Sequence, residues 1–171
     1  MQRHFTVTGF VAQNGRTALH WHRLGRWLPP GGHIEPNEDP LQAVLREVRE
    51  EIGLEVEVIP TAEGFRYDGP PQLPVPATIA IYDLVDGDRQ VRAHHQHIDL
   101  VYFTRPHSAS AVPASDRDED AWLWVDAAQL RGDAELTHPT SRRSARVPAD
   151  VRELGLAALA AAERAPAPTG R

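Results

Sequence analysis

Three glutamates stand close together in the sequence, at a spacing that a helix would bring onto one side. Glu47, Glu50 and Glu51 are related as i, i+3 and i+4, so on a helix they occupy one arc of roughly 100°. Carboxylate oxygens are the ligands that hard divalent cations prefer. The alternative is an acidic face exposed to solvent. Such a face would leave like charges side by side, with Arg46 as the compensating charge nearby, which counts against it without excluding it.

A helix over residues 40–52 must carry these glutamates. Asp39 can accept hydrogen bonds from the first-turn amides, Pro40 suits the first helical position, and Gln42 can complete a capping box. Gly53 can take the left-handed conformation that ends a helix. Apolar residues at helical spacing predict the buried face: Leu41, Val44, Leu45, Val48 and Ile52.

The glutamates belong to a longer pattern that runs from Gly32 to Leu54. The pattern G-x5-E-x7-R-E-U-x-E-E-x-G-U is matched at every defined position, by Gly32, Glu38, Arg46, Glu47, Val48, Glu50, Glu51, Gly53 and Leu54. The sequence therefore resembles the Nudix, or MutT-like, hydrolase family. The resemblance implies an α/β (α+β) fold, namely an α/β/α sandwich with a mixed β-sheet between helices. It also implies Mg²⁺-dependent hydrolysis of a diphosphate linkage in a nucleoside diphosphate joined to another group.

The resemblance also implies roles for individual residues. The metal, Mg²⁺ or in some relatives Mn²⁺, would be bound by Glu47, Glu50 and Glu51 and by the backbone carbonyl of Gly31. A carboxylate would accept a proton from the attacking water, either within the pattern or on a later loop. The predicted catalytic residues are therefore the polar residues of the pattern and two loop acids: Glu38, Arg46, Glu47, Glu50, Glu119 and Asp120.

Substrate contacts are predicted around the glycine pair and on a later strand. A glycine that enters a helix lets the backbone approach phosphate oxygens closely. The candidates are Arg23, Arg26, Gly32, His33, His95 and His97. His95, His97 and Asp99 alternate along a predicted strand and so share one face. That face has three interpretations: solvated side chains, substrate contacts, or a small metal site.

The remaining elements are read from periodicity and turn residues. Asn14-Gly15 between two apolar runs predicts a hairpin, and the glycines and prolines that follow predict a loop. The expected strands are Phe5 to Val11, Thr17 to Arg23, Val56 to Pro60, Ala77 to Asp83, His97 to Thr104 and Ala121 to Val125. The expected loops are Leu24 to Asn37 and Arg105 to Asp120, and the later helical segments are Ala127 to Leu130 and Asp150 to Glu163, the last capped by Asp150.

Length and composition bound the class of protein. A chain of 171 residues suits one domain, predicted at residues 1–163, with a disordered tail at 164–171. The net charge of -6 argues against a nucleic-acid partner. The absence of cysteine excludes thiolate chemistry and Cys-ligated zinc, and with them the related isomerase that needs a catalytic cysteine. No apolar run reaches membrane-spanning length, so we expect a soluble, cytoplasmic protein.

The group attached to the diphosphate is the least constrained part of the prediction. The substrate is expected to be a small nucleotide diphosphate: ADP-ribose, a nucleotide sugar, a dinucleoside polyphosphate or a nucleoside triphosphate. Pro70 lies near the position where ADP-ribose pyrophosphatases of this family carry a proline, which slightly favours ADP-ribose. The alternative function is a non-catalytic Nudix domain that senses a nucleotide. The intact Glu47, Glu50 and Glu51 disfavour it.

Overall fold

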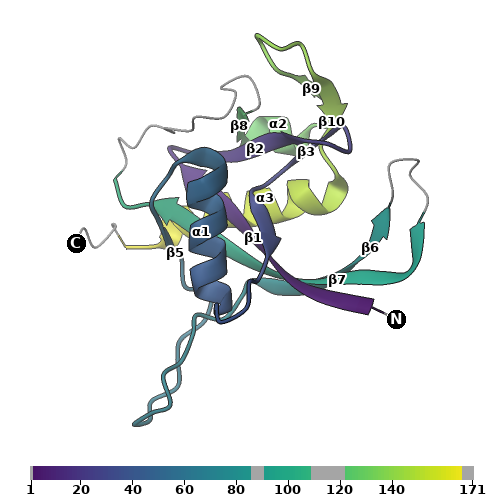
Figure 1. Cartoon of the computed structure of the whole chain (residues 1–171). Helices are drawn as coiled ribbons and strands as arrows, with labels where there is room; N and C mark the ends of the chain where they lie inside the picture. The colour runs from purple at the N-terminus through teal and green to yellow at the C-terminus, as the bar shows by residue number, and fades with distance from the viewer. Residues whose placement is uncertain (1, 86–90, 109–121, 167–171) are drawn as a thin grey trace.

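The computed structural model describes residues 2–85, 91–108 and 122–166 (Figure 1). The strands within these ranges are β1 (Gln2–Gln13), β2 (Arg16–His22), β3 (Arg26–Leu28), β4 (Gly31–His33), β5 (Val56–Val58), β6 (Thr78–Val85), β7 (Val91–Pro106), β8 (Trp122–Asp126), β9 (Glu135–Thr137) and β10 (Ser144–Arg146). The helices are α1 (Pro40–Ile52), α2 (Ala127–Arg131) and α3 (Ala149–Arg164). Among the described residues, no helix is both long and apolar enough to cross a membrane.

The two longest strands, β1 and β7, form the centre of a mixed sheet. They run parallel, in a register that begins at Gln2↔His95 and ends at Val11↔Thr104. β2 and β4 pair with β1 in the antiparallel sense, as β5 and β6 do with β7. β3 and β8 pair with β2, and β9 and β10 form a separate two-stranded sheet. The predicted mixed sheet is therefore confirmed.

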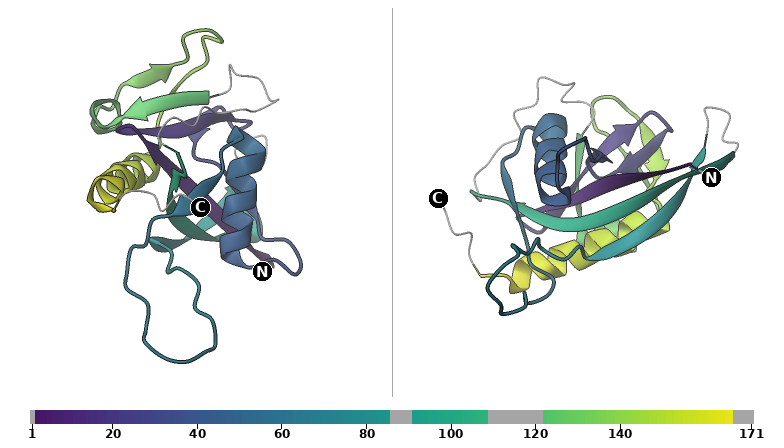
Figure 2. Two further views of the ribbon diagram at one scale, coloured as in Figure 1. Left: turned by 90° about the vertical axis from the view of Figure 1, so that its left-hand side faces the viewer. Right: turned by 60° about the horizontal axis from the view of Figure 1, so that its bottom comes forward.

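Alternating residues of β1 pack against helices on opposite faces of the sheet. Val7 and Val11 belong to one buried cluster with the apolar face of α1, whereas Phe10 and Ala12 belong to a second cluster with α3. This alternation follows from the two-residue period of a strand. Figure 2 shows α1 and α3 on the two sides of the sheet. The predicted α/β/α arrangement is therefore confirmed.

The hairpin between β1 and β2 forms as the Asn14-Gly15 pair predicts. Both residues have positive φ angles, 49° and 72°, as a two-residue turn of this kind requires. Gln13 pairs with Arg16 directly across the turn. The turn thus sets the register of β2 on β1.

The predicted loop from Leu24 to Asn37 is wrong in part. It contains the short strands β3 and β4, because Arg26 to Leu28 pair with β2 and Gly31 to His33 pair with β1. Glycines and prolines in the sequence predict a loop, but pairing with a distant strand decides the structure here. β4 brings the glycine pair to the centre of the sheet.

The start of α3 also differs from the prediction. The helix begins at Ala149 after Pro148, and no side chain caps it. Asp150 lies in the first turn and instead accepts a hydrogen bond from the Tyr82 hydroxyl, at 3.1 Å. The predicted capping role of Asp150 is therefore wrong.

β7 is longer than predicted at both ends. It includes Arg105 and Pro106, which were expected to start a long loop. The Arg105 guanidinium donates to the carbonyl of Pro166, which ties the chain beyond α3 to the sheet. Residues 167–171 lie outside the described part of the chain, so the tail at 164–171 stays a prediction.

Gly9 permits a close approach between α1 and the sheet. A Cβ atom at this position would lie 2.7 Å from Val48 Cγ2 and 3.0 Å from Val44 Cγ2. Both valines are fully buried, so neither has space to retreat. We expect Gly9→Ala to destabilise the protein by about 1 to 3 kcal/mol through overpacking, measured by chemical unfolding.

The matched control is Gly132→Ala at the end of α2. A Cβ there would meet its nearest atom, the Gln129 carbonyl oxygen, at 3.5 Å, an ordinary contact. Its φ angle of -70° suits any residue. Equal stabilities for Gly9→Ala and Gly132→Ala would contradict the close packing of α1 on β1.

Candidate active site

Local capping interactions fix the helix that carries the glutamates. The Asp39 carboxylate accepts from the Gln42 amide and the Gln42 side chain accepts from the Asp39 amide, both at 2.9 Å. Gly53 ends the helix in the left-handed conformation, with φ 68°, and its N–H donates to the Arg49 carbonyl. The capping box and the glycine end are therefore as predicted. With Val44 and Val48 facing the sheet, the helical period places the glutamates beside the buried stripe.

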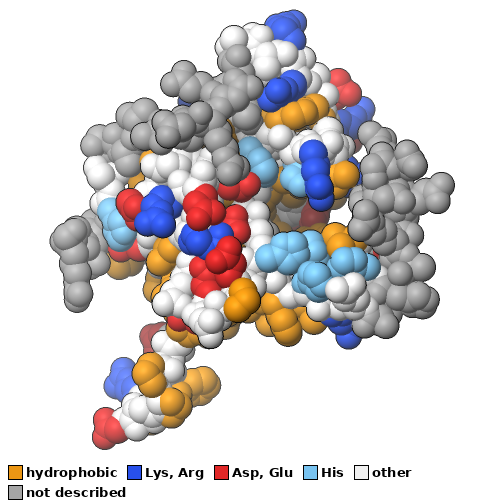
Figure 3. Space-filling model, viewed as in Figure 1, with side chains coloured by type: hydrophobic (Ala, Val, Ile, Leu, Met, Phe, Trp, Pro, Cys, Tyr) orange, Lys and Arg blue, Asp and Glu red, His pale blue; other side chains and the backbone are white. Residues whose placement is uncertain are grey.

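The Arg46 guanidinium lies at the centre of the carboxylates. Its Nε and Nη2 atoms donate to the two oxygens of Glu38 at 2.8 and 2.9 Å. Its Nη1 atom donates to Glu47 at 2.8 Å and to Glu50 at 3.3 Å. Figure 3 shows acidic side chains gathered around a basic one on this face. A single cation thus holds three carboxylates in one cluster.

The same hydrogen bonds shift the ionisation of both partners. The paired hydrogen bonds from Arg46 lower the pKa of Glu38, which keeps this carboxylate ionised. The hydrogen bonds to Glu38, followed by those to Glu47, raise the pKa of Arg46. Both groups are therefore charged at neutral pH.

β4 places the glycine pair directly against the glutamates. The Gly31 N–H donates to Glu51 Oε2 at 3.0 Å. A Cβ atom at Gly32 would lie 2.3 Å from Glu47 Oε1, so the Glu47 carboxylate occupies the space that a side chain at this position would fill. The absence of a side chain at Gly32 is thus a requirement of the site.

These residues fit a hard divalent cation. Glu47, Glu50 and Glu51 provide oxygen ligands of the kind that Mg²⁺ and Mn²⁺ take. The Gly31 amide holds Glu51, and the space at Gly32 admits the Glu47 carboxylate. The site therefore has the ligand chemistry that the family resemblance implies. Coordination by the Gly31 carbonyl stays a prediction.

The histidines predicted to contact substrate gather beside this cluster. The rings of His33 and His97 lie 4.8 Å apart, and both neighbour the ring of His4. His95 lies 4.8 Å from His4. Figure 3 shows a patch of histidine side chains next to the acidic cluster. The sequence predicted three of the four, and a substrate role for any of them stays a prediction.

His4 was missed because its neighbours come from distant segments. It pairs in register with His97 across the parallel strands β1 and β7, a pairing that no local pattern reveals. His20 also approaches the glutamates. Its Nε2 atom lies 4.0 Å from Glu51 Oε2, and its ring stacks on Trp122 at 5.1 Å.

Arg23 lies in the turn after β2, and Arg26 is the first residue of β3. There they help to lower the pKa of His22, after the larger effect of its burial. The structure thus places them beside an imidazole, and their predicted contact with phosphate stays a prediction. Glu119 and Asp120 lie outside the described residues, so their role as loop acids also stays a prediction.

Three tryptophans are wholly or partly buried. Trp27 is fully buried, and its indole N–H donates to the Leu136 carbonyl at 2.9 Å. It is therefore a core residue. Trp122 and Trp124 are partly buried against the cluster that includes α1.

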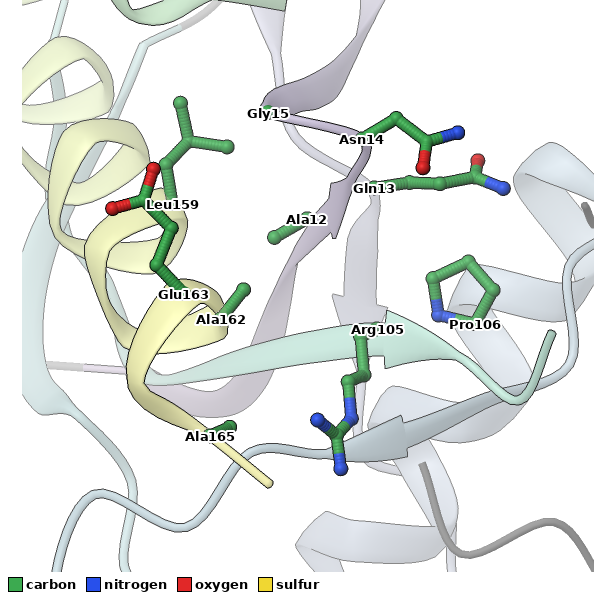
Figure 4. A pocket seen from close by; sticks show the side chains of 10 residues that line it. All are labelled: Ala12, Gln13, Asn14, Gly15, Arg105, Pro106, Leu159, Ala162, Glu163 and Ala165. Atoms are coloured by element: carbon green, nitrogen blue, oxygen red, sulfur yellow. The ribbon is translucent and has the colours of Figure 1, made fainter. Parts of the chain in front are cut away.

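A separate pocket lies between the β1–β2 turn, the end of β7 and the last turns of α3 (Figure 4). Its lining is mainly small and apolar, with Arg105 and Glu163 at the sides. None of the predicted site residues lines it. The pocket is therefore not the place where the carboxylates act.

Comparison with known proteins agrees with this site. A family model, NUDIX domain, matches residues 2–147. The chain is 46% identical over 43 residues to an asymmetrical bis(5'-nucleosyl)-tetraphosphatase from Mus musculus, which is 25% of this chain and 29% of that protein. It is 31% identical over 126 residues to an RNA pyrophosphohydrolase from Methylococcus capsulatus, which is 69% of this chain and 61% of that protein. The chain thus spans less than two thirds of the length of these curated relatives.

The fold is shared with a solved NUDIX family hydrolase from Clostridium perfringens. The two have a TM-score of 0.67 and 26% sequence identity, over 94% of this chain and 98% of the other. Together with the match over residues 2–147, this shows that the chain belongs to the NUDIX domain family. Within the segment Gly32 to Leu54, Arg46 joins Glu38, Glu47 and Glu50, and Glu51 accepts a hydrogen bond from the Gly31 N–H.

The close contact between Gly32 and the Glu47 carboxylate predicts an effect of Gly32 substitution on metal binding. In Gly32→Ala the new Cβ would displace the Glu47 carboxylate, the flexible end of a side chain, and leave the backbone in place. We expect the affinity for Mn²⁺, measured by calorimetry, to fall by about tenfold or more, with little change in melting temperature.

Gly31→Ala provides the contrast. A Cβ atom there would lie 2.4 Å from the backbone oxygen of Val7, which cannot move without breaking the pairing of β4 with β1. We expect a lowered melting temperature with or without metal. Unchanged Mn²⁺ affinity in a folded Gly32→Ala protein would show that the position of Glu47 against β4 does not matter for the metal.

Proposed function

We propose that this chain is a pyrophosphohydrolase that cleaves a diphosphate linkage in a nucleotide derivative, with Mg²⁺ as its ion and Mn²⁺ as a substitute. The observation that carries the proposal is the position of Glu47 and Glu51 against the glycines of β4, with Glu50 joined to Glu47 through Arg46. Oxygen ligands on a preformed helix face match the ion that diphosphate substrates bring with them. The family membership supports the same reaction class.

The chain's own residues divide the work in this proposal. The bound ion would neutralise the diphosphate and lower the pKa of a coordinated water. Arg46 orients Glu38, Glu47 and Glu50 through the hydrogen bonds described above. The Gly31 amide orients Glu51. Because these groups are already in place, little reorganisation is needed when the substrate binds.

The reaction itself needs one proton acceptor. The water oxygen forms a bond to phosphorus, the bridging P–O bond breaks, and the leaving phosphate takes the electron pair. A carboxylate takes the proton from the water. We propose that this acceptor is either a glutamate of the Gly32 to Leu54 segment or one of the loop acids Glu119 and Asp120.

The names of the relatives favour a dinucleoside polyphosphate over ADP-ribose as the substrate. Three of them are named asymmetrical bis(5'-nucleosyl)-tetraphosphatases, and two are named RNA pyrophosphohydrolases. Pro70, the basis for ADP-ribose, is exposed in a long arm, residues 60–76, that projects from the body of the molecule (Figures 1 and 2). We therefore propose a dinucleoside polyphosphate as the preferred substrate, ahead of ADP-ribose.

A substrate panel tests this proposal. The panel contains a dinucleoside polyphosphate, ADP-ribose, a nucleotide sugar, a nucleoside triphosphate and a 5'-triphosphorylated RNA, each assayed with Mg²⁺ and with Mn²⁺. We expect the highest kcat/KM for the dinucleoside polyphosphate, with a nucleoside monophosphate among the products. Binding of a nucleotide without turnover of any panel member would support the alternative, a nucleotide-sensing NUDIX domain.

The metal role of Glu51 predicts a loss of activity without a loss of fold. Glu51→Gln removes a ligand charge, so transition-state stabilisation worth several kcal/mol is lost and turnover should fall by more than about 100-fold. Because a metal that binds the folded state raises its melting temperature, the variant should also show a smaller Mg²⁺-induced rise than the wild type.

The matched control is Glu55→Gln. The Glu55 side chain is 72% exposed and lies 3.9 Å from Arg49, beyond the end of α1. This variant should keep both the activity and the Mg²⁺ response of the wild type. An active Glu51→Gln protein with a normal Mg²⁺ response would place the metal elsewhere.

A further inference from the structure

A cluster of imidazoles lies where three strands meet. His4 comes from β1, His97 is its register partner on β7, and His33 is the last residue of β4. One ring nitrogen from each can be chosen so that all three atoms lie within 4.8 Å of one another. Paired strands hold all three residues, so the cluster is built into the sheet.

We propose that His4, His33 and His97 bind a transition-metal ion of the Zn²⁺ class, at a site separate from the carboxylates of α1. Zinc bonds to imidazole nitrogens are about 2.0–2.1 Å long, so tetrahedral ligand atoms are separated by about 3.4 Å. The nitrogens therefore need to close by about 1.4 Å at most, which small side-chain rotations achieve without moving the strands.

The ligand set selects the kind of ion. Imidazole nitrogens suit Zn²⁺, Ni²⁺, Cu²⁺ and Co²⁺, whereas Mg²⁺ and Ca²⁺ prefer oxygen ligands. Three protein ligands leave a coordination position for water or another small ligand, as in open zinc sites. The cluster and the glutamates would thus bind different ions.

The proximity of the three ring nitrogens carries the proposal. Metals bind the neutral form of imidazole. Burial, followed by the neighbouring His33, His4 and His95, lowers the pKa of His97 to about 4, which favours that form.

The position of His33 gives such an ion a structural effect. Its backbone carbonyl accepts a hydrogen bond from Arg46 Nη2 at 3.0 Å, and the glycine pair precedes it on β4. An ion shared by His4, His33 and His97 would fasten the end of β4 to β1 and β7. This inference does not depend on the proposed hydrolytic activity.

Zinc titration of the untagged, full-length protein tests the inference. Calorimetry with Zn²⁺ in excess Mg²⁺, which occupies the carboxylates, should show one saturable site. Zn²⁺ should raise the melting temperature, because it binds the folded state. His4→Gln and His97→Gln should each weaken Zn²⁺ binding by more than about tenfold. Removing a residue that only hydrogen-bonds to a metal ligand already lowers metal affinity by about 10- to 100-fold, and these two residues are proposed as ligands themselves. Metal-free melting checks that both variants fold.

Two control variants complete the experiment. His107→Gln changes a half-exposed histidine near Glu57 and should leave Zn²⁺ binding unchanged, as should Glu51→Gln. Absence of a saturable site, equal loss in His107→Gln, or loss in Glu51→Gln would each overturn the inference. So would a wild-type protein whose melting temperature rises with inorganic phosphate and not with Zn²⁺, because the cluster would then be an anion site.

Discussion

The hydrogen bonds of the Arg46 guanidinium connect the parts of this molecule that the site requires. The Arg46 side chain is 17% exposed. It donates hydrogen bonds to Glu38 before α1, to Glu47 and Glu50 on α1, and to the backbone carbonyl of His33 on β4. A planar group with donors in a fixed fork can satisfy several acceptors at once. Without this charge, the carboxylates would repel one another, and of the hydrogen bonds described between α1 and β4 the one from Gly31 to Glu51 would remain.

The arrangement around Arg46 depends in turn on how closely α1 approaches the sheet. Gly9 brings the helix against β1, and β1 also pairs with β4. The helix and the glycine pair are therefore positioned by the same strand. Two residues without side chains allow α1 to approach these strands closely: Gly9 on β1 and Gly32 on β4.

The sequence predicted best where the interactions are local. The bounds of α1 follow from Asp39, Gln42 and Gly53, whose hydrogen bonds reach no more than four residues along the chain, and the family's spacing located the glutamates. The pairing of β1 with β7 joins residues far apart in sequence, so it could not be read from any window. His4 was missed for this reason.

β4 was predicted as a loop because of its glycines, whereas its pairing with β1 is a tertiary interaction. Asp150 had the right residue type for a cap, but the start of α3 at Ala149 gave its carboxylate a different partner, Tyr82.

The projecting arm of residues 60–76 has hydrogen bonds within itself. The Phe65 backbone exchanges two hydrogen bonds with the Gln72 side chain, and the Thr61 hydroxyl donates to the Val75 carbonyl. The arm connects β5 to β6, and both of these strands pair with β7. Changes in the length of the arm can therefore be absorbed without altering the spacing of the two strands on β7. During evolution this segment can gain or lose residues, and acquire new recognition surfaces, while the glutamates and glycines around Arg46 stay in place.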